Sequence, residues 1–260
     1  MSLARFRLYT HYVTPTFAKL NLLGLLHALR LANTAVVLGV EPLGYNYAVV
    51  VAGPGQGRLL ESMAGAVRRG LGGIAWRGLL RGAARGHAEQ SAKLGAGDMA
   101  AILSEAMHDS RGSGGQTPSL ALAPELGKFS TASIPHPSAY PSIRDAGKDG
   151  TSVCTLLALA GWSHCAFKWR TATGRGGWRH LVAYPAPRES LGYAEARTLY
   201  WAGLRLAKFS EHFAALKKGR PLSTLGLLAL LSPPVRDAAA APTTLSKLEL
   251  NIYTLEQDGW

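Results

Sequence analysis

The sequence contains little cysteine and little acidic charge, and both features exclude some classes of protein. Its 260 residues include two cysteines, Cys154 and Cys165, and both stand in apolar runs that we interpret as strand-like. Two cysteines exclude a disulfide framework, and a single pair cannot complete a structural zinc site. We therefore expect no metal, no cofactor and a reducing, cytoplasmic setting.

Long uninterrupted apolar segments are also missing. The N-terminal stretch MSLARFRLYTHYVTP carries charges where a secretion signal needs an apolar centre. The most apolar segment, 20–40, is interrupted by His27, Arg30 and Asn33, and the run 225–231 is too short to cross a bilayer. We expect a soluble protein with no membrane partner.

Acidic residues are few beside the basic ones. Lysine and arginine total 28 against 16 aspartates and glutamates, which gives a formal net charge of +12. Such an imbalance favours binding to nucleic acid or to an anionic membrane surface, and acidic small-molecule substrates rarely need so much positive charge. A hydrophobic content of 47% is enough for a real core in one large or two modest domains.

The segment from Ser163 to Pro185, SHCAFKWRTATGRGGWRHLVAYP, predicts a β-hairpin. Its first half alternates between two sets of side chains with the two-residue period of a half-buried strand. The stretch TGRGG supplies three glycines for a tight reversal, and WRHLVAY forms the returning strand.

This hairpin concentrates cations and aromatic rings, and no acidic residue lies between Ser163 and Ala186. Cations mixed with flat π-faces suit the phosphates and bases of a nucleic acid. A basic edge that only discourages aggregation between strands is the alternative explanation. The candidate binding residues are Lys168, Arg170, Arg175, Trp178, Arg179 and His180, with Trp169 as a second ring for stacking.

Two further groups of arginines extend the predicted binding surface. Arg77, Arg81 and Arg85 recur every four residues in the segment 58–94, which we expect to be helical, so they form a stripe along one side. The first predicted strand, 3–11, has an alternating pattern that separates a core face from a basic and aromatic face. The residues on that second face are Arg5, Arg7, Tyr9 and His11.

The order of the predicted elements indicates an α+β fold. It runs strand 3–11, helix 17–32, strand 35–40, strand 45–52, helix 58–94 and then a late strand in the hairpin. This β-α-β-β-α-β order is that of a ferredoxin-like (RRM-like) core, whose open sheet face stacks bases in RNA-recognition modules. We place this core in residues 1–185, with a long insertion at about 109–150. The region 186–260 is predicted to hold C-terminal helices at 193–216 and 221–231, and a final strand or arm at 245–255.

Several stretches also resemble subunits of CRISPR ribonucleoproteins. The strand ARFRL, the stretches TAVVLG and GYNYAVVVAG and the basic helical segment after them resemble the backbone subunit of archaeal type I (Cascade-type) surveillance complexes. Later stretches, VCTLLALAGW and WRHLVAYPAP with a leucine-rich helical end, resemble instead the large or signature subunit. The resemblance implies a non-catalytic protein of antiviral defence that holds guide RNA or target DNA by backbone and shape, beside other subunits.

Two other functions stay open. A metal-independent endoribonuclease that processes guide RNA would need His11 or His27 as general acid or base beside a hydroxyl such as that of Tyr9. The ending KLELNIYTLEQDGW lacks the glycine-rich loop of such processing enzymes, so we expect no enzyme and assign no catalytic residue. We read His27 as a core or boundary histidine. A basic adaptor that contacts only proteins is the third possibility.

Overall fold

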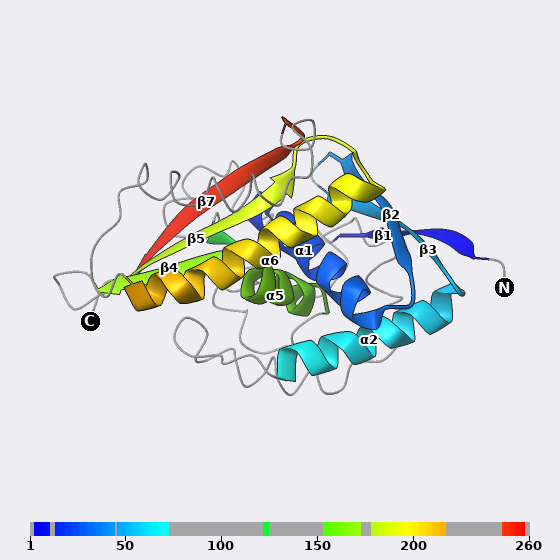
Figure 1. The fold of residues 1–260 in the computed structure, drawn as a ribbon, viewed down its shortest axis with the longest axis horizontal. Coiled ribbons are helices and arrows are strands. Elements are labelled where there is room, and N and C mark those ends of the chain that lie inside the picture. The colour runs from blue at the N-terminus through cyan, green and yellow to red at the C-terminus, as the bar shows by residue number, and fades with distance from the viewer. Residues whose placement is uncertain are drawn as a thin grey trace, which may run out of the picture.

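A computed structural model describes most of the segments in which the sequence predicts regular structure. It shows a chain of mixed helix and sheet, in which helices pack between and beside two antiparallel sheets (Figure 1). The α+β class is therefore confirmed. The described residues are 3–10, 14–44, 46–72, 122–124, 153–172, 178–216 and 246–257.

The N-terminal elements follow the predicted order. They are β1 (Ala4–Tyr9), α1 (Pro15–Ala32), β2 (Val36–Leu43), β3 (Asn46–Gly53) and α2 (Gln56–Gly72). The predicted helix 58–94 is thus confirmed as far as Gly72, and its remainder, like the predicted insertion apart from residues 122–124, lies outside the described residues. The loop GPGQG between β3 and α2 is a strand-to-helix turn, in which Gly55 has a φ of 127°.

Helix α1 begins and ends where its capping residues predict. The Thr14 side chain accepts a hydrogen bond of 3.2 Å from the Phe17 backbone N–H, and Pro15 occupies the first helical position. At the other end Asn33 takes the left-handed conformation, with a φ of 50°, and its N–H donates to the Leu29 carbonyl. These caps fix the position of Arg30 in the last turn.

The first sheet has the strand order β1–β3–β2–β6, in which β6 is the short strand Leu191–Gly192. All of its neighbouring strands pair antiparallel. Leu8 on β1 and Val49 and Val51 on β3 are buried against α1 in one large core cluster. The opposite side chains of these strands therefore lie on the sheet face away from α1.

The chain re-enters the described structure as a helix, which corrects the sequence prediction. Helix α5 (Val153–Cys165) contains both cysteines, which were expected in strands, and it takes in the first residues of the predicted hairpin. Leu156, Leu157, Leu159 and other residues of α5 are fully buried, so this helix is apolar on nearly all sides. A segment without an apolar stripe gives no helical period, and its pattern does not distinguish a buried helix from a buried strand.

Helices α1 and α5 cross at two glycines that let their backbones touch. A Cβ at Gly24 would lie 1.7 Å from the Leu157 carbonyl oxygen, and one at Gly161 would lie 2.0 Å from the Leu20 carbonyl oxygen. No side chain fits at either position. This contact holds α5 in the middle of the molecule, where it supports the residues of the candidate site.

The predicted hairpin forms the larger part of a second sheet. Its strands are β4 (Phe167–Ala172) and β5 (Trp178–Pro187), and β7 (Leu248–Gln257) pairs along the other edge of β5. The late strand therefore does not join the first sheet. Residues 181–187 of β5 are all buried, because α6 covers one face of this sheet and α1 contacts part of the other, where the Tyr184 hydroxyl bonds to Thr16.

Helix α6 (Tyr193–Leu216) matches its predicted bounds and links the two sheets. It starts directly after β6 beside β2 and extends across β4 and β5 (Figure 1). The large core cluster includes Leu199 of α6 and Leu248 of β7 together with α1 and the first sheet, so it draws on residues from both sides of position 185.

Candidate nucleic-acid interface

The two tryptophans of the predicted hairpin have different positions. Trp169 is 8% exposed and packs in a second core cluster with Phe167, Leu181 and Leu206. The expectation that Trp169 is available for base stacking is therefore wrong. Its side of the strand faces α6, which the sequence period alone could not reveal. For Trp178 the structure describes the backbone, which pairs with Gln257.

Lys168 is engaged by its own chain. Its Nζ donates a hydrogen bond of 2.5 Å to the Ser163 carbonyl oxygen in the last turn of α5 and lies 4.9 Å from the centre of the Trp162 ring. A cation at this place satisfies a carbonyl of the helix end and interacts with the negative end of the helix dipole. Lys168 thus stabilises the junction between α5 and β4.

The remaining cations of the hairpin lie toward its distal end. The backbone pairs Arg170 with His180 and places Arg179 opposite Thr171 on β4 and Glu256 on β7. The third strand therefore brings a carboxylate residue beside a hairpin whose own sequence has none. Arg175 lies outside the described residues, as do Arg77, Arg81 and Arg85.

Only part of the basic and aromatic face predicted on β1 is exposed in the structure. Arg5 and Arg7 are exposed on the sheet face away from α1, and Arg7 forms an ion pair of 3.0 Å with Glu41 on β2. Tyr9 is 8% exposed and belongs to the buried part of the strand, so it does not extend this face as expected. His11 lies outside the described residues.

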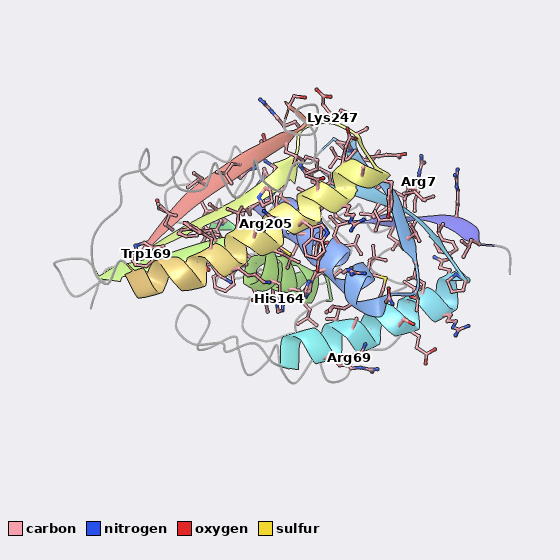
Figure 2. The ribbon with its side chains drawn as sticks, viewed as in Figure 1. Arg7, Arg69, His164, Trp169, Arg205 and Lys247 are labelled. Atoms are coloured by element: carbon pink, nitrogen blue, oxygen red, sulfur yellow. The ribbon has the colours of Figure 1, made fainter. Side chains whose placement is uncertain are left out.

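A row of exposed side chains on α6 was missed by the sequence reasoning. Arg197, Trp201, Arg205 and Lys208 are separated by four, four and three residues, so they follow one side of the helix, and each is exposed. We call these four residues the α6 row. None of its three cations forms an ion pair with a described residue. Figure 2 marks Arg205 within the row, on a different helix from Arg69 of α2. The sequence contains this spacing, with cations at i, i+8 and i+11 and a tryptophan at i+4, but the apolar period is the stronger signal in this segment.

The first half of the α6 row borders a cleft of about 310 Å³. The cleft lies where α1 ends, β2 begins and α6 runs past both. Its cations are Arg30 and Arg197, and none of the described residues that line it is acidic. Its aromatic walls are Tyr193, Tyr200 and Trp201, of which Tyr193 is 53% and Trp201 39% exposed.

A stacked histidine pair, His27 buried and His164 half-buried, lies behind Tyr200 of this cleft. The His27 ring stacks on the His164 ring, with centroids 4.3 Å apart, and its Nδ1 lies 3.2 Å from the Tyr200 hydroxyl oxygen. Burial, with repulsion from His164, lowers the pKa of His27 to about 4, and burial raises the pKa of Tyr200 to about 12. At neutral pH both groups are therefore uncharged, and His27 is a core histidine as expected.

The described residues provide neither a reactive cysteine nor a group of metal ligands. Cys165 is a free, buried thiol, and burial raises its pKa to about 12, so it is a poor nucleophile. Within the described segments no three His, Cys, Asp or Glu side chains gather as metal ligands.

None of the helices in the described part of the chain combines the length and apolar character needed to span a bilayer.

Comparison with known proteins identifies no family for the chain. No protein-family description matches it, and no curated protein matches it significantly.

Proposed function

We propose that this chain is a non-catalytic nucleic-acid-binding protein that grips a sugar-phosphate strand with the α6 row. The observation that carries the proposal is the exposure of Arg197, Arg205 and Lys208 without a described carboxylate partner, with Trp201 between them. Cations release counterions when they neutralise phosphates, and an aromatic ring adds stacking to bases, so this combination suits a single strand.

The spacing of the α6 row supports the same proposal. Arg197 and Arg205 are eight residues apart on one helix, so their Cα atoms are separated along its axis by about 12 Å. Successive phosphates of a nucleic acid strand are closer than this, and the two guanidinium groups therefore reach phosphates two or more nucleotides apart. Strands β4 and β5, which carry Arg170 and Arg179, contact α6, and we propose that these two residues belong to the same binding surface.

We further propose a place for this chain in an RNA-guided CRISPR effector. The support is the sequence resemblance to backbone and large subunits of type I complexes, together with the strand order β1–β3–β2 and helices α1 and α2, which suit a ferredoxin-like core. In such a complex, guide RNA or target DNA is held by its backbone and pairing supplies the sequence specificity. The partners are then the nucleic acid and other subunits in the cytoplasm.

Charge reversal on α6 tests the binding proposal. The variant R197E/R205E is compared with R58E/R69E, which changes the net charge equally but alters exposed arginines of α2. Fluorescence anisotropy with a labelled RNA of about 20 nucleotides measures affinity between about 50 and 200 mM salt. We expect the α6 variant to bind at least tenfold more weakly, and its log–log salt slope to fall by about 1.4, because two phosphate contacts of a single strand are lost. Equal losses in both variants would contradict the proposal.

Copurification tests the place in a complex. We expect the protein isolated from its native cells to carry a discrete short RNA of nearly constant length, together with other subunits. Negligible binding to any nucleic acid at near-physiological salt would instead favour an adaptor that contacts only proteins.

An endoribonuclease is the second candidate, and the hydrogen bond between His27 and Tyr200 is the observation that favours it. The tyrosine that faces His27 is Tyr200 rather than Tyr9, and Tyr200 lines the basic cleft. However, His27 itself does not line the cleft, and with a pKa of about 4 it is not in the imidazolium form that acts as a general acid at neutral pH. Cleavage of a repeat RNA in EDTA that is lost in His27→Ala would establish the enzyme.

A further inference from the structure

The cleft between α1, β2 and α6 differs from the rest of the basic surface because it has depth as well as charge. We propose that it holds one unstacked nucleotide of a bound single strand, with the base against the aromatic wall and the phosphate between Arg30 and Arg197. This inference rests on the proposed nucleic-acid binding and specifies the form of the ligand.

The charge of the cleft comes from its two arginines. Helix α1 ends at the cleft and α6 begins there, so the partial negative end of one helix dipole is offset by the partial positive end of the other. Arg30 and Arg197 therefore set the electrostatic potential, because the described lining of the cleft contains no acidic residue and neither arginine pairs with a described carboxylate. A phosphate is the anion that two neighbouring guanidinium groups bind well.

The aromatic wall of the cleft, formed by Tyr193, Tyr200 and Trp201, offers ring surfaces on which a flat ligand can stack. The rings of Tyr200 and Trp201 adjoin, with centroids 5.8 Å apart and planes inclined by 59°. The hydrogen bond between His27 and the Tyr200 hydroxyl fixes the orientation of the Tyr200 ring. Trp201 and Tyr193 keep a large part of their surface exposed. Exposed rings beside unpaired cations bind an unstacked base at little conformational cost.

A polar group for the base edge is also present. Asn33, the C-cap of α1, lines the cleft, and its backbone N–H is already used in the bond to Leu29. Its side-chain amide carries both a donor and an acceptor, which is what the edge of a base requires.

The size of the cleft sets the form of the ligand. A volume of 310 Å³ is at the lower end of the range of ligand pockets, about 300–1,000 Å³. It accommodates one nucleotide, whereas the bases of a duplex are stacked and paired and cannot enter. We therefore expect a preference for single strands that depends on the aromatic wall, while the cations of the α6 row act on any strand.

The test compares Trp201→Ala with Trp201→Phe and with Leu43→Ala, an exposed apolar residue at the far end of β2. Anisotropy is measured with a labelled single-stranded RNA and with the matching duplex, and thermal unfolding checks that each variant is folded. We expect Trp201→Ala to bind the single strand roughly 5- to 100-fold more weakly, the usual cost of losing one stacked base, with duplex binding unchanged. Trp201→Phe should keep most of the affinity, and Leu43→Ala should keep all of it.

Three results would overturn the inference. If Trp201→Ala binds single strands like the unaltered protein while R197E/R205E still loses binding, then α6 grips a strand but the cleft takes no base. If adenosine monophosphate binds more tightly than the RNA, the cleft serves a free nucleotide and not a strand. If no nucleic acid binds at all, the proposed function fails first, and the inference fails with it.

Discussion

The buried ring of His27 stacks on the half-buried ring of His164, with planes inclined by 17°. They come from α1 and α5, the helices whose backbones touch at Gly24 and Gly161, and the Tyr200 hydroxyl of α6 bonds to His27. Three helices therefore meet at a group that must stay neutral to remain buried. This arrangement makes the stability of the fold sensitive to pH below the pKa of an unfolded histidine.

We predict that stability falls with acidification between about pH 6.5 and pH 4. The pKa of His27 is about 4 in the folded chain and 6.5 when unfolded, so the unfolded state binds a proton first in this window. The contribution of His27 is complete above pH 6.5 and is lost progressively as the pH falls toward 4. It is on the order of 3 kcal/mol, and urea unfolding at several pH values measures it.

The control for this prediction is His27→Phe, which keeps a flat ring beside His164 but cannot titrate. Its unfolding free energy should depend less on pH than that of the unaltered protein across this window. Parallel pH profiles would show that other groups cause the dependence.

We predict that Gly24→Ala destabilises the fold by about 3 kcal/mol or more, since the new methyl group meets the Leu157 backbone and not a movable side chain. Gly57→Ala in the first turn of α2 is the matched control. A Cβ there meets nothing within 4 Å, so we expect a gain of about 0.5 kcal/mol from the better helix former. Denaturant unfolding measures both, and equal effects would contradict the close helix crossing.

We predict that the hairpin cations contribute to nucleic-acid binding. The variant R170E/R175E/R179E should weaken RNA binding strongly and reduce its salt dependence, because three phosphate contacts become repulsive. Anisotropy titrations under the conditions used for R197E/R205E allow a direct comparison. Unchanged affinity would remove the hairpin from the binding surface and leave the α6 row alone.

We predict that the ion pair between Lys19 and Glu249 couples α1 to β7 more strongly than a surface pair does. The Lys19 Nζ lies 2.6 Å from Glu249 Oε1, and the two side chains are 20% and 33% exposed. Burial raises the pKa of Glu249, but hydrogen bonds from Lys19 and Asn251 lower it by more, so its pKa lies below the usual range. A double-mutant cycle with Lys19→Met and Glu249→Gln should give a coupling of about 1 kcal/mol at neutral pH.

The pair Arg7–Glu41 is the reference for this cycle, with side chains 57% and 38% exposed, and its coupling should be smaller. The Glu249 contribution is present above the pKa of an unfolded glutamate and is lost as the pH falls through the lower folded value. A coupling for Lys19–Glu249 that persists well below both values would contradict this explanation.

Much of the fold could be predicted because its signals are local. Thr14 with Pro15 marks the start of α1, strict alternation marks β1, and the apolar period marks α6 over its full length. Helix α5 was missed because its interior position removes the amphipathic period. The separate sheet of β4, β5 and β7 was missed because pairing over a long sequence separation leaves no local signal.

The candidate site was harder to predict because distant segments build it. Arg30 and Arg197 are far apart in the sequence, and only the packing of α6 beside the end of α1 brings them to one cleft. The sequence analysis placed cations with aromatic rings on the hairpin, but the packing of α6 buries one of those rings, Trp169. Whether a given tryptophan faces solvent depends on what covers its strand, and the strand period does not contain that information.

The pairing of β7 with β5 determines how the molecule is assembled during translation. All ten residues of β5 have a partner on β7, yet β7 follows β5 in the chain by a long interval that includes α6. As the nascent chain leaves the ribosome, one edge of an apolar strand stays open until residues 248–257 emerge. An unpaired apolar strand edge can pair with another chain and aggregate. A longer interval before β7 pairs with β5 is therefore expected to lower the yield of correctly folded protein.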